Sequence, residues 1–302
     1  MSLIPGDDDV TTDAGGAAGS SVVPVVRMRG ISKSFGHIQA LRTVDLDLYP
    51  GEVVALVGDN GAGKSTLVKI LAGVHTQDAG TVEFEGRAVS IPSPSASRDL
   101  GIATVFQDLA LCDNLDVVAN LFLGQELGHG PLDEEAMEQR SWELLRRLSA
   151  RIPSVRMPVA TLSGGQRQIV AIARSLIGEP AVVILDEPTA ALGIAQTAEV
   201  LNLIELLRDR GHCVVLISHN MADVQAVADR VIVLRLGRVN GRFRAPEMSY
   251  ENIIASITGV LNLEEGTPED DPRERSFDMR SPDTRPGSTP GGTFDPRDGG
   301  PR

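Results

Sequence analysis

The 302-residue sequence lacks any run of about 18 apolar residues, so we expect no segment of it to span a bilayer. It also lacks a basic N-terminal region followed by an apolar stretch, which is the pattern of a secretory signal. We therefore expect a cytoplasmic protein that reaches a membrane only by docking on another protein.

Cysteine and positive charge are scarce as well. The two cysteines, Cys112 and Cys213, lie far apart and form no disulfide framework or CxxC metal pattern, which favours a reducing compartment. The formal net charge is −13. A chain short of Lys and Arg is poorly suited to neutralising the phosphates of nucleic acid or to adhering to anionic lipid. We expect no nucleic-acid partner.

The two ends of the chain differ in composition from its middle. Residues 1–23 are rich in Gly, Ala, Ser, Thr and Asp, and residues 263–302 are dense in Pro, Gly, Asp and Arg. Such segments bury too little apolar surface to offset the entropy of ordering, so both are predicted to be disordered tails. The C-terminal one could instead be a docking arm. The folded domain is expected over residues 24–262.

Strand and helix patterns alternate between the tails, which predicts an α/β fold with a mostly parallel sheet. Continuous apolar runs are typical of strands covered on both faces, and they occur at Val53–Val57, Ile102–Phe106, Ala181–Leu185 and Cys213–Ile217. Alternating apolar and polar residues over 44–49, and more briefly over 82–84, predict half-exposed antiparallel strands.

Helical periodicity appears in three stretches, where apolar residues recur at the spacing of one helix face. They are Ile169, Ile172, Ala173 and Leu176; Val200, Leu203, Ile204 and Leu207; and Met137, Leu144, Leu145 and Leu148. The third stripe lies in residues 108–160, which show no strong strand pattern. We interpret that stretch as a helical insertion into the α/β core.

A glycine-rich segment, GDNGAGKS over residues 58–65, joins the apolar strand 52–57 to an apolar helix. The glycines let backbone N–H groups turn toward phosphate oxygens, and the helix adds its positive dipole end. Lys64 supplies charge for the β- and γ-phosphates and the Ser65 hydroxyl a ligand for Mg²⁺. The predicted ATP-binding residues are Gly58, Asn60, Gly61, Ala62, Gly63, Lys64, Ser65 and Thr66. The alternative is a glycine turn without a ligand.

Two acids, Asp186 and Glu187, follow the apolar run 181–185, at the end of a parallel strand where such sheets bind ligands. Adjacent residues of a strand point to opposite sides, so we expect the acids to have different roles. Asp186 is predicted to bind Mg²⁺, directly or through water, and Glu187 to orient or deprotonate the attacking water. The alternative for such a pair is a helix N-cap.

The segment Leu162–Gln166 reads LSGGQ and lies between these two motifs. Together they make residues 25–245 resemble the ATP-binding subunits of ATP-binding-cassette (ABC) transporters, for which LSGGQ is specific. The resemblance implies an ATP hydrolase that uses ATP and Mg²⁺. It also implies a P-loop NTPase core with an antiparallel β subdomain and a helical subdomain inserted before LSGGQ.

A second anion site is predicted at LSGGQ. Ser163 begins a helix, and Gly164 and Gly165 leave its N-terminal backbone donors open, although a simple serine cap is the alternative. The resemblance implies that Ser163, Gly164, Gly165 and Gln166 close over the γ-phosphate held by a partner subunit. One phosphate loop and one LSGGQ per chain then require a homodimer, arranged head to tail around a two-fold axis.

Three further residues match family positions one at a time. Phe35 looks like the aromatic residue that stacks on adenine, although a lone Phe is often core. Gln107 looks like the glutamine that binds Mg²⁺ or water and reports occupancy to the helical insertion. His219 looks like the histidine that contacts the γ-phosphate, although its position equally suits a cap for the helix beginning near Asn220. The other histidines, His75 among them, match no motif and are expected at the surface.

One position departs from the family pattern. Most members have an Asp where this chain has Gly193, and a glycine cannot make the side-chain contact by which that Asp communicates across the dimer. This variant, with segment 218–224, resembles cassettes of bacterial ribose, xylose and fructose importers. The resemblance implies uptake of a small solute, a sugar, through a transmembrane permease served by a solute-binding protein, with the cassette on the inner membrane face. A soluble non-transport ATPase and an export subunit are the alternatives.

Overall fold

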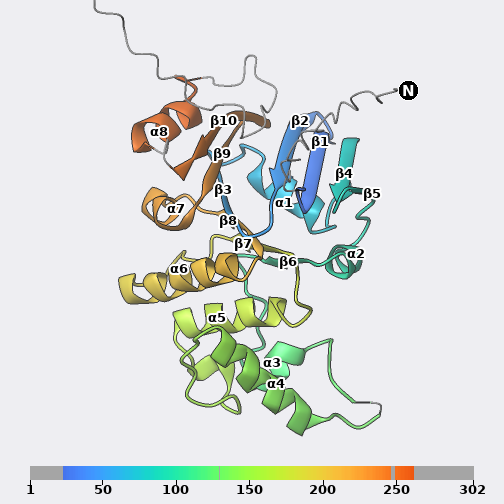
Figure 1. Ribbon diagram of the computed structural model, residues 1–302, viewed down its shortest axis with the longest axis vertical. Helices are drawn as coiled ribbons and strands as arrows, with labels where there is room; N and C mark the ends of the chain where they lie inside the picture. The colour runs from blue at the N-terminus through green and yellow to red at the C-terminus, as the bar shows by residue number, and fades with distance from the viewer. Residues whose placement is uncertain (1–22, 129, 246–248, 262–302) are drawn as a thin grey trace, which may run out of the picture. The chain divides into compact units, whose positions relative to one another are not determined.

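The computed structural model describes residues 23–128, 130–245 and 249–261 (Figure 1). The chain divides into two units, Met1–Glu265 and Gly266–Arg302, and all the described residues belong to the first. The predicted tails lie outside the described residues, apart from Val23. Within the described part, no helix combines the length and apolar character that crossing a membrane requires.

Six strands form a largely parallel sheet in the order β10-β9-β3-β8-β7-β6. They are β3 (Val53–Val57), β6 (Ile102–Val105), β7 (Val182–Asp186), β8 (Cys213–Ile217), β9 (Arg230–Arg235) and β10 (Arg238–Arg244). Only the β9–β10 pair of this sheet is antiparallel. The four apolar runs in the sequence form β3, β6, β7 and β8, so the prediction of a mostly parallel sheet is confirmed.

A second, antiparallel sheet has the order β2-β1-β4-β5. Its strands are β1 (Val26–Phe35), β2 (Ile38–Leu48), β4 (Ala79–Phe84) and β5 (Arg87–Val89). The antiparallel strands predicted at 44–49 and 82–84 are confirmed as parts of β2 and β4. One detail was wrong, because Asp47, expected on an exposed face, is only 2% exposed. Its carboxylate accepts a 2.7 Å hydrogen bond from Arg29, and this charge pairing makes its burial tolerable.

Both faces of the parallel sheet are covered, as the side chains of β3 illustrate. Val53, Ala55 and Val57 belong to the core shared with α5 (Gly164–Ser175) and α6 (Ile194–Asp209). Val54 and Leu56 belong to the core shared with α1 (Lys64–Leu71) and the antiparallel sheet. Successive side chains of a strand point to opposite faces, so a strand between two cores must be apolar throughout.

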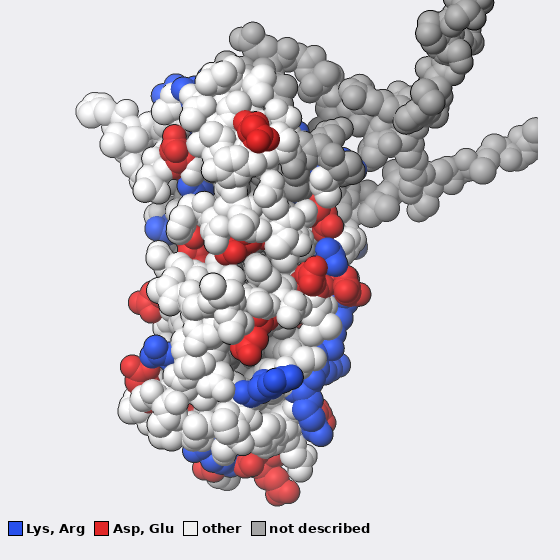
Figure 2. Space-filling view, turned by 90° about the vertical axis from the view of Figure 1, so that its left-hand side faces the viewer, with Lys and Arg blue, Asp and Glu red and all other residues white. Residues whose placement is uncertain are grey.

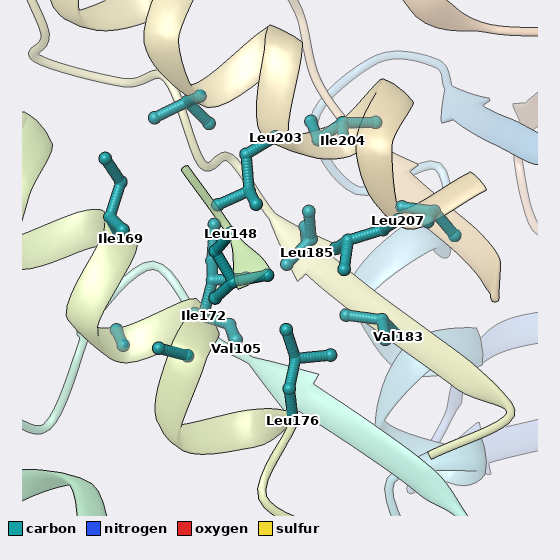
Figure 3. Close-up of a cluster of buried hydrophobic side chains, with 14 of the residues drawn as sticks. Val105, Leu148, Ile169, Ile172, Leu176, Val183, Leu185, Leu203, Ile204 and Leu207 are labelled. Carbon is teal, nitrogen blue, oxygen red and sulfur yellow. The ribbon is translucent and has the colours of Figure 1, made fainter. Parts of the chain in front are cut away.

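The first of these cores is built by the helix stripes that the sequence predicted. Figure 3 shows Val183 and Leu185 of β7 among the side chains of α5 and α6, including Ile172, Leu203 and Leu207. All five side chains are buried. This packing fixes α5 and α6 against the strand that leads to Asp186 and Glu187.

The stretch 108–160, predicted to be a helical insertion, contains α3 (Val117–Phe122), α4 (Glu134–Arg147) and the 3₁₀ turn Val159–Thr161. Figure 1 shows α3 and α4 beside α5. In the α4 stripe, Met137 and Leu145 are buried. Figure 2 shows Lys and Arg side chains gathered on the lower part of one face, where these helices lie, with Asp and Glu spread over the whole of it. The short helices α2 (Pro94–Asp99), α7 (Met221–Val227) and α8 (Tyr250–Thr258) complete the described fold.

Candidate active site

The phosphate loop connects β3 to α1, and two of its glycines, Gly58 and Gly63, are required by the packing of the fold as well as by a ligand. Gly58 has a φ of 143° and Gly63, which caps α1, a φ of 109°, both in the region that favours glycine. A Cβ at Gly58 would lie 2.1 Å from the carbonyl oxygen of Leu234 in β9. A Cβ at Gly63 would lie 2.7 Å from that of Ala40 in β2. The neighbouring strands therefore fix these positions as glycine before any phosphate binds.

Lys64 is folded back over this loop. Its Nζ donates hydrogen bonds to the carbonyl oxygens of Gly58, at 2.6 Å, and Asp59, at 3.0 Å. Burial lowers the pKa of Lys64, and the carboxylates of Glu187, Asp59 and Asp186 oppose that shift. Carboxylates from two motifs therefore act on the pKa of Lys64. These motifs, residues 58–65 and 186–187, lie more than a hundred residues apart in the sequence.

The backbone turns between the two acids at the end of β7, which the sequence did not reveal. Asp186 is the last residue of β7, whereas Glu187 lies beyond the strand with a left-handed φ of 51°. The expectation that strand alternation separates them is therefore wrong, since the turn re-aims Glu187. The helix-cap alternative is also wrong, because the next helix, α6, begins at Ile194 with Gly193 as its cap.

Glu187 is paired with His219. The carboxylate Oε2 of Glu187 lies 2.8 Å from Nδ1 of His219, and the Glu187 side chain is 17% exposed against 76% for the histidine. With Nδ1 protonated, the imidazole donates to the carboxylate. The alternative that His219 caps α7 is wrong, because the Asn220 side-chain oxygen accepts from the Ala222 N–H at 3.1 Å. The structure brings these two predicted catalytic residues together.

The donor set fits a magnesium ion held mainly by nucleotide. Among the described residues, no three His, Cys, Asp or Glu side chains lie together as a metal site. Mg²⁺ in nucleotide sites is usually bound by only one or two carboxylates, together with substrate phosphates and several waters. The oxygen donors predicted here, from Ser65, Asp186 and Gln107, suit that chemistry.

Phe35 stands at the end of β1 and is 43% exposed, so the alternative that it belongs to the core is wrong. The rings of His75 and Phe35 form a T-shaped pair with 5.1 Å between centroids, and the Lys33 ammonium lies 5.5 Å from the Phe35 centroid. Asp78 accepts from Lys33 Nζ and from the Ser34 N–H, both at 2.7 Å, and these bonds lower the pKa of Asp78. The sequence did not indicate that His75 and Asp78 support this aromatic side chain.

Ser163 caps α5 through a reciprocal pair of hydrogen bonds. Its Oγ accepts from the Gln166 N–H at 3.3 Å, and the Gln166 side-chain oxygen accepts from the Ser163 N–H at 3.0 Å. The simple serine cap is thus realised in the single chain. The role of Ser163 toward a nucleotide in a partner subunit stays a prediction.

One glycine of LSGGQ, Gly165, also has a packing role, which the motif alone did not indicate. Gly165 is buried, and a Cβ there would lie 2.9 Å from the Cβ of Gln196 in α6. At Gly164 the nearest atom would be the end of the Leu192 side chain, at 3.2 Å. Gly165 therefore permits the close approach of α5 to α6.

Replacing Gly165 by Ala is expected to lower the free energy of unfolding by up to about 2 kcal/mol, because overpacking costs about 1–3 kcal/mol and the better helix propensity of alanine returns about 1 kcal/mol. G164A is the matched control. The Leu192 side chain can move, and alanine favours a helix over glycine by about 1 kcal/mol, so its net effect should be small. Urea unfolding of the two variants measures the difference. Equal losses would contradict the packing role of Gly165.

Gln107 follows β6 and is exposed. The next residues are tied to α5, because the guanidinium of Arg174 donates to the carbonyl oxygens of Leu109 and Ala110, both at 2.7 Å. The segment after Gln107 is therefore attached to the helix that Ser163 begins. The predicted relay between Gln107 and the helical insertion stays a prediction.

Comparison with known proteins points to one family. A family model described as ABC transporter matches residues 41–190. The xylose/arabinose import ATP-binding protein XylG of Sulfolobus acidocaldarius is 42% identical over 246 residues, which cover 80% of this chain and 98% of that protein. The fructose import ATP-binding protein FrcA of Rhizobium meliloti is 43% identical, with 78% and 95% covered. The ribose import ATP-binding protein RbsA 1 of Burkholderia cenocepacia is 40% identical, but the chain spans only 47% of its length.

Solved structures agree in fold. An ATP-binding cassette of an ABC transporter in its ADP conformation matches with a TM-score of 0.70 and 26% identity, covering 78% of this chain and 99% of that one. A dimeric cassette in a post-hydrolysis state, bound to ADP and Pi, matches with a TM-score of 0.62 and 26% identity, covering 73% and 98%. The chain belongs to the ATP-binding, ATP-hydrolysing subunits of ABC transporters.

Proposed function

We propose that this subunit energises the uptake of a sugar through a separate transmembrane permease, which a solute-binding protein supplies. The observation that carries the proposal is the identity of 42–43% to two sugar import ATP-binding proteins over nearly their whole length. We place the subunit on the inner face of the cell membrane, held there by the permease. No observation favours a soluble ATPase or an export subunit.

The proposed mechanism uses two copies of the chain, with each ATP held between the phosphate loop of one copy and the LSGGQ segment of the other. Lys64 and the loop N–H groups bind the phosphates, and Phe35 stacks on the adenine. Ser65, Asp186 and Gln107 would hold Mg²⁺, which neutralises phosphate charge when bound. Glu187, oriented by His219, positions the attacking water. Binding closes the dimer and hydrolysis releases it.

Transport in vesicles tests the proposal. The chain, its permease and its solute-binding protein are reconstituted with ATP inside and xylose, arabinose, fructose or ribose outside. We expect ATP-dependent uptake of at least one of these sugars and its loss in the E187Q variant. Active hydrolysis without uptake of any sugar, or without binding to a multi-span membrane protein, would overturn sugar import and leave the ATPase assignment in place.

Asp186 gives a prediction about pH and stability. Burial, and then the charge of Glu187, raise the pKa of Asp186. The folded state binds this proton more tightly than the unfolded state, so the associated stability is greatest at low pH and is lost as pH rises through the raised pKa. D186N removes the buried charge, so it should raise the free energy of unfolding at pH 7, and this gain should shrink toward pH 4.

D186N should lower the rate of ATP turnover, although it raises the free energy of unfolding at pH 7. Loss of the predicted Mg²⁺ ligand is expected to lower ATP hydrolysis by about 10²- to 10³-fold, the scale of removing one electrostatic stabiliser of the transition state. Urea unfolding at the two pH values and steady-state phosphate release measure the two effects. A D186N variant less stable than the wild type at pH 7 would contradict the role of burial.

A further inference from the structure

The carboxylate of Asp223 joins the two segments that carry Glu187 and His219. Asp223 lies in the first turn of α7 and is 5% exposed. Its Oδ2 accepts a 2.6 Å hydrogen bond from the Thr189 hydroxyl, and its Oδ1 accepts from the Asn220 side-chain amide at 3.0 Å. Thr189 comes two residues after Glu187, and Asn220 directly follows His219. The buried carboxylate of Asp223 therefore holds one residue close in sequence to Glu187 and one next to His219.

Both segments are short and internally bonded. On the histidine side, the Asn220 N–H donates to the Ser218 hydroxyl at 3.0 Å, and the Asn220 side chain caps α7. On the glutamate side, the Ala190 N–H donates to the Glu187 carbonyl oxygen at 3.2 Å and closes a turn that includes Thr189. A shift of Thr189 against Asn220 would therefore be passed to Glu187 and His219.

Glu187 needs such a restraint. A non-glycine residue with a φ of 51° occupies a region that costs about 1–3 kcal/mol and persists only where surrounding structure fixes it. The Thr189–Asp223 distance of 2.6 Å is in the range of a hydroxyl bonded to an ionised carboxylate, which is stronger than a neutral hydrogen bond. The bond lies two residues from the strained position.

We propose that Asp223 is a positioning residue for hydrolysis, which fixes Glu187 relative to His219 by holding Thr189 and Asn220. The inference rests on the proposed roles of Glu187 and His219. Both carboxylate oxygens of Asp223 are occupied by protein donors within a buried site, so Asp223 is not expected to touch nucleotide. Its loss should therefore lower kcat and leave ATP affinity nearly unchanged.

A matched pair at Thr189 tests this positioning without disturbing the charge of Asp223. T189V keeps the shape and removes the hydroxyl, while T189S keeps the hydroxyl. Loosened positioning of a reacting group costs up to about 100-fold in rate, so we expect T189V to lower kcat by about tenfold and T189S to restore it to within about threefold of wild type. The Kd for ATP, measured with EDTA present, should change by less than about threefold.

D223A completes a double-mutant cycle. We expect D223A to lower kcat at least as much as T189V does, and D223A/T189V to lose no more than D223A alone. Thermal unfolding is followed in parallel, since a merely structural role would reduce activity only through the fraction unfolded. Wild-type kcat in T189V, equal losses in T189S and T189V, or additive losses in the double variant would each overturn the inference. A wild-type chain without ATP hydrolysis would instead overturn the proposed function.

Discussion

Glu187→Gln is expected to lower ATP turnover by about 10²- to 10⁴-fold, the range that a positioned general base contributes. The carboxylate lies 2.8 Å from Nδ1 of His219. The amide keeps the size of the side chain but cannot accept a proton from the attacking water. Phosphate release under steady-state conditions measures the loss.

ATP affinity should survive this substitution, because Lys64 and the phosphate loop are unchanged. E187Q should therefore bind ATP with a Kd within about threefold of wild type, as expected for a group that acts only in the transition state. E199Q, an equivalent change at an exposed glutamate of α6, is the control and should hydrolyse ATP normally. Wild-type turnover in E187Q would remove Glu187 from its proposed role.

The same variant tests the proposed dimer. If ATP bridges two copies and hydrolysis releases them, E187Q with ATP and Mg²⁺ should accumulate as a dimer, whereas the wild type should return to monomer as ATP is consumed. Light scattering during size-exclusion chromatography distinguishes these states. A monomeric E187Q that still binds ATP would argue against the bridge, without affecting the assignment of Glu187 to the chemistry.

Much of the fold could be predicted because its strands are buried on both faces. β3 and residues 182–185 of β7 pack against a core on each side, so they are apolar at every position and stand out in the sequence. The phosphate loop was equally recognisable, because strand, glycines, lysine and helix are contiguous. These features depend on residues close together in the chain.

Features created by contacts between distant segments could not be predicted. The left-handed backbone at Glu187 has no sequence marker, since glutamate is not a residue that favours it. The buried Asp47 occupies the polar position of an alternating pattern and is neutralised by Arg29 from another strand. The packing role of Gly165 depends on Gln196, and the bond from Thr189 to Asp223 spans 34 residues. Predicting any of these features requires knowing which helices and strands pack against each other.

Lys64→Ala is expected to weaken ATP binding by about 100-fold, which corresponds to about 2.8 kcal/mol. The ammonium now donates to the carbonyl oxygens of Gly58 and Asp59, and it can exchange these contacts for phosphate oxygens. Its removal also takes away one of the positive charges that oppose the nearby carboxylates of Glu187 and Asp186, so they would repel the triphosphate more strongly. Titration calorimetry with ATP measures the loss.

The pH dependence of binding separates this electrostatic role from a loss of folding. Burial lowers the pKa of Lys64, and only the protonated amine attracts phosphate. The wild-type affinity for ATP should therefore fall as pH rises through that lowered pKa, at a pH below the ordinary titration of lysine near about 10.4. K64A lacks the group and should show a flat profile over the same range. R98A, which removes one positive charge from an exposed residue of α2, should keep both the wild-type affinity and its pH dependence. Parallel pH profiles in wild type and K64A would show that the ammonium of Lys64 does not hold the phosphates.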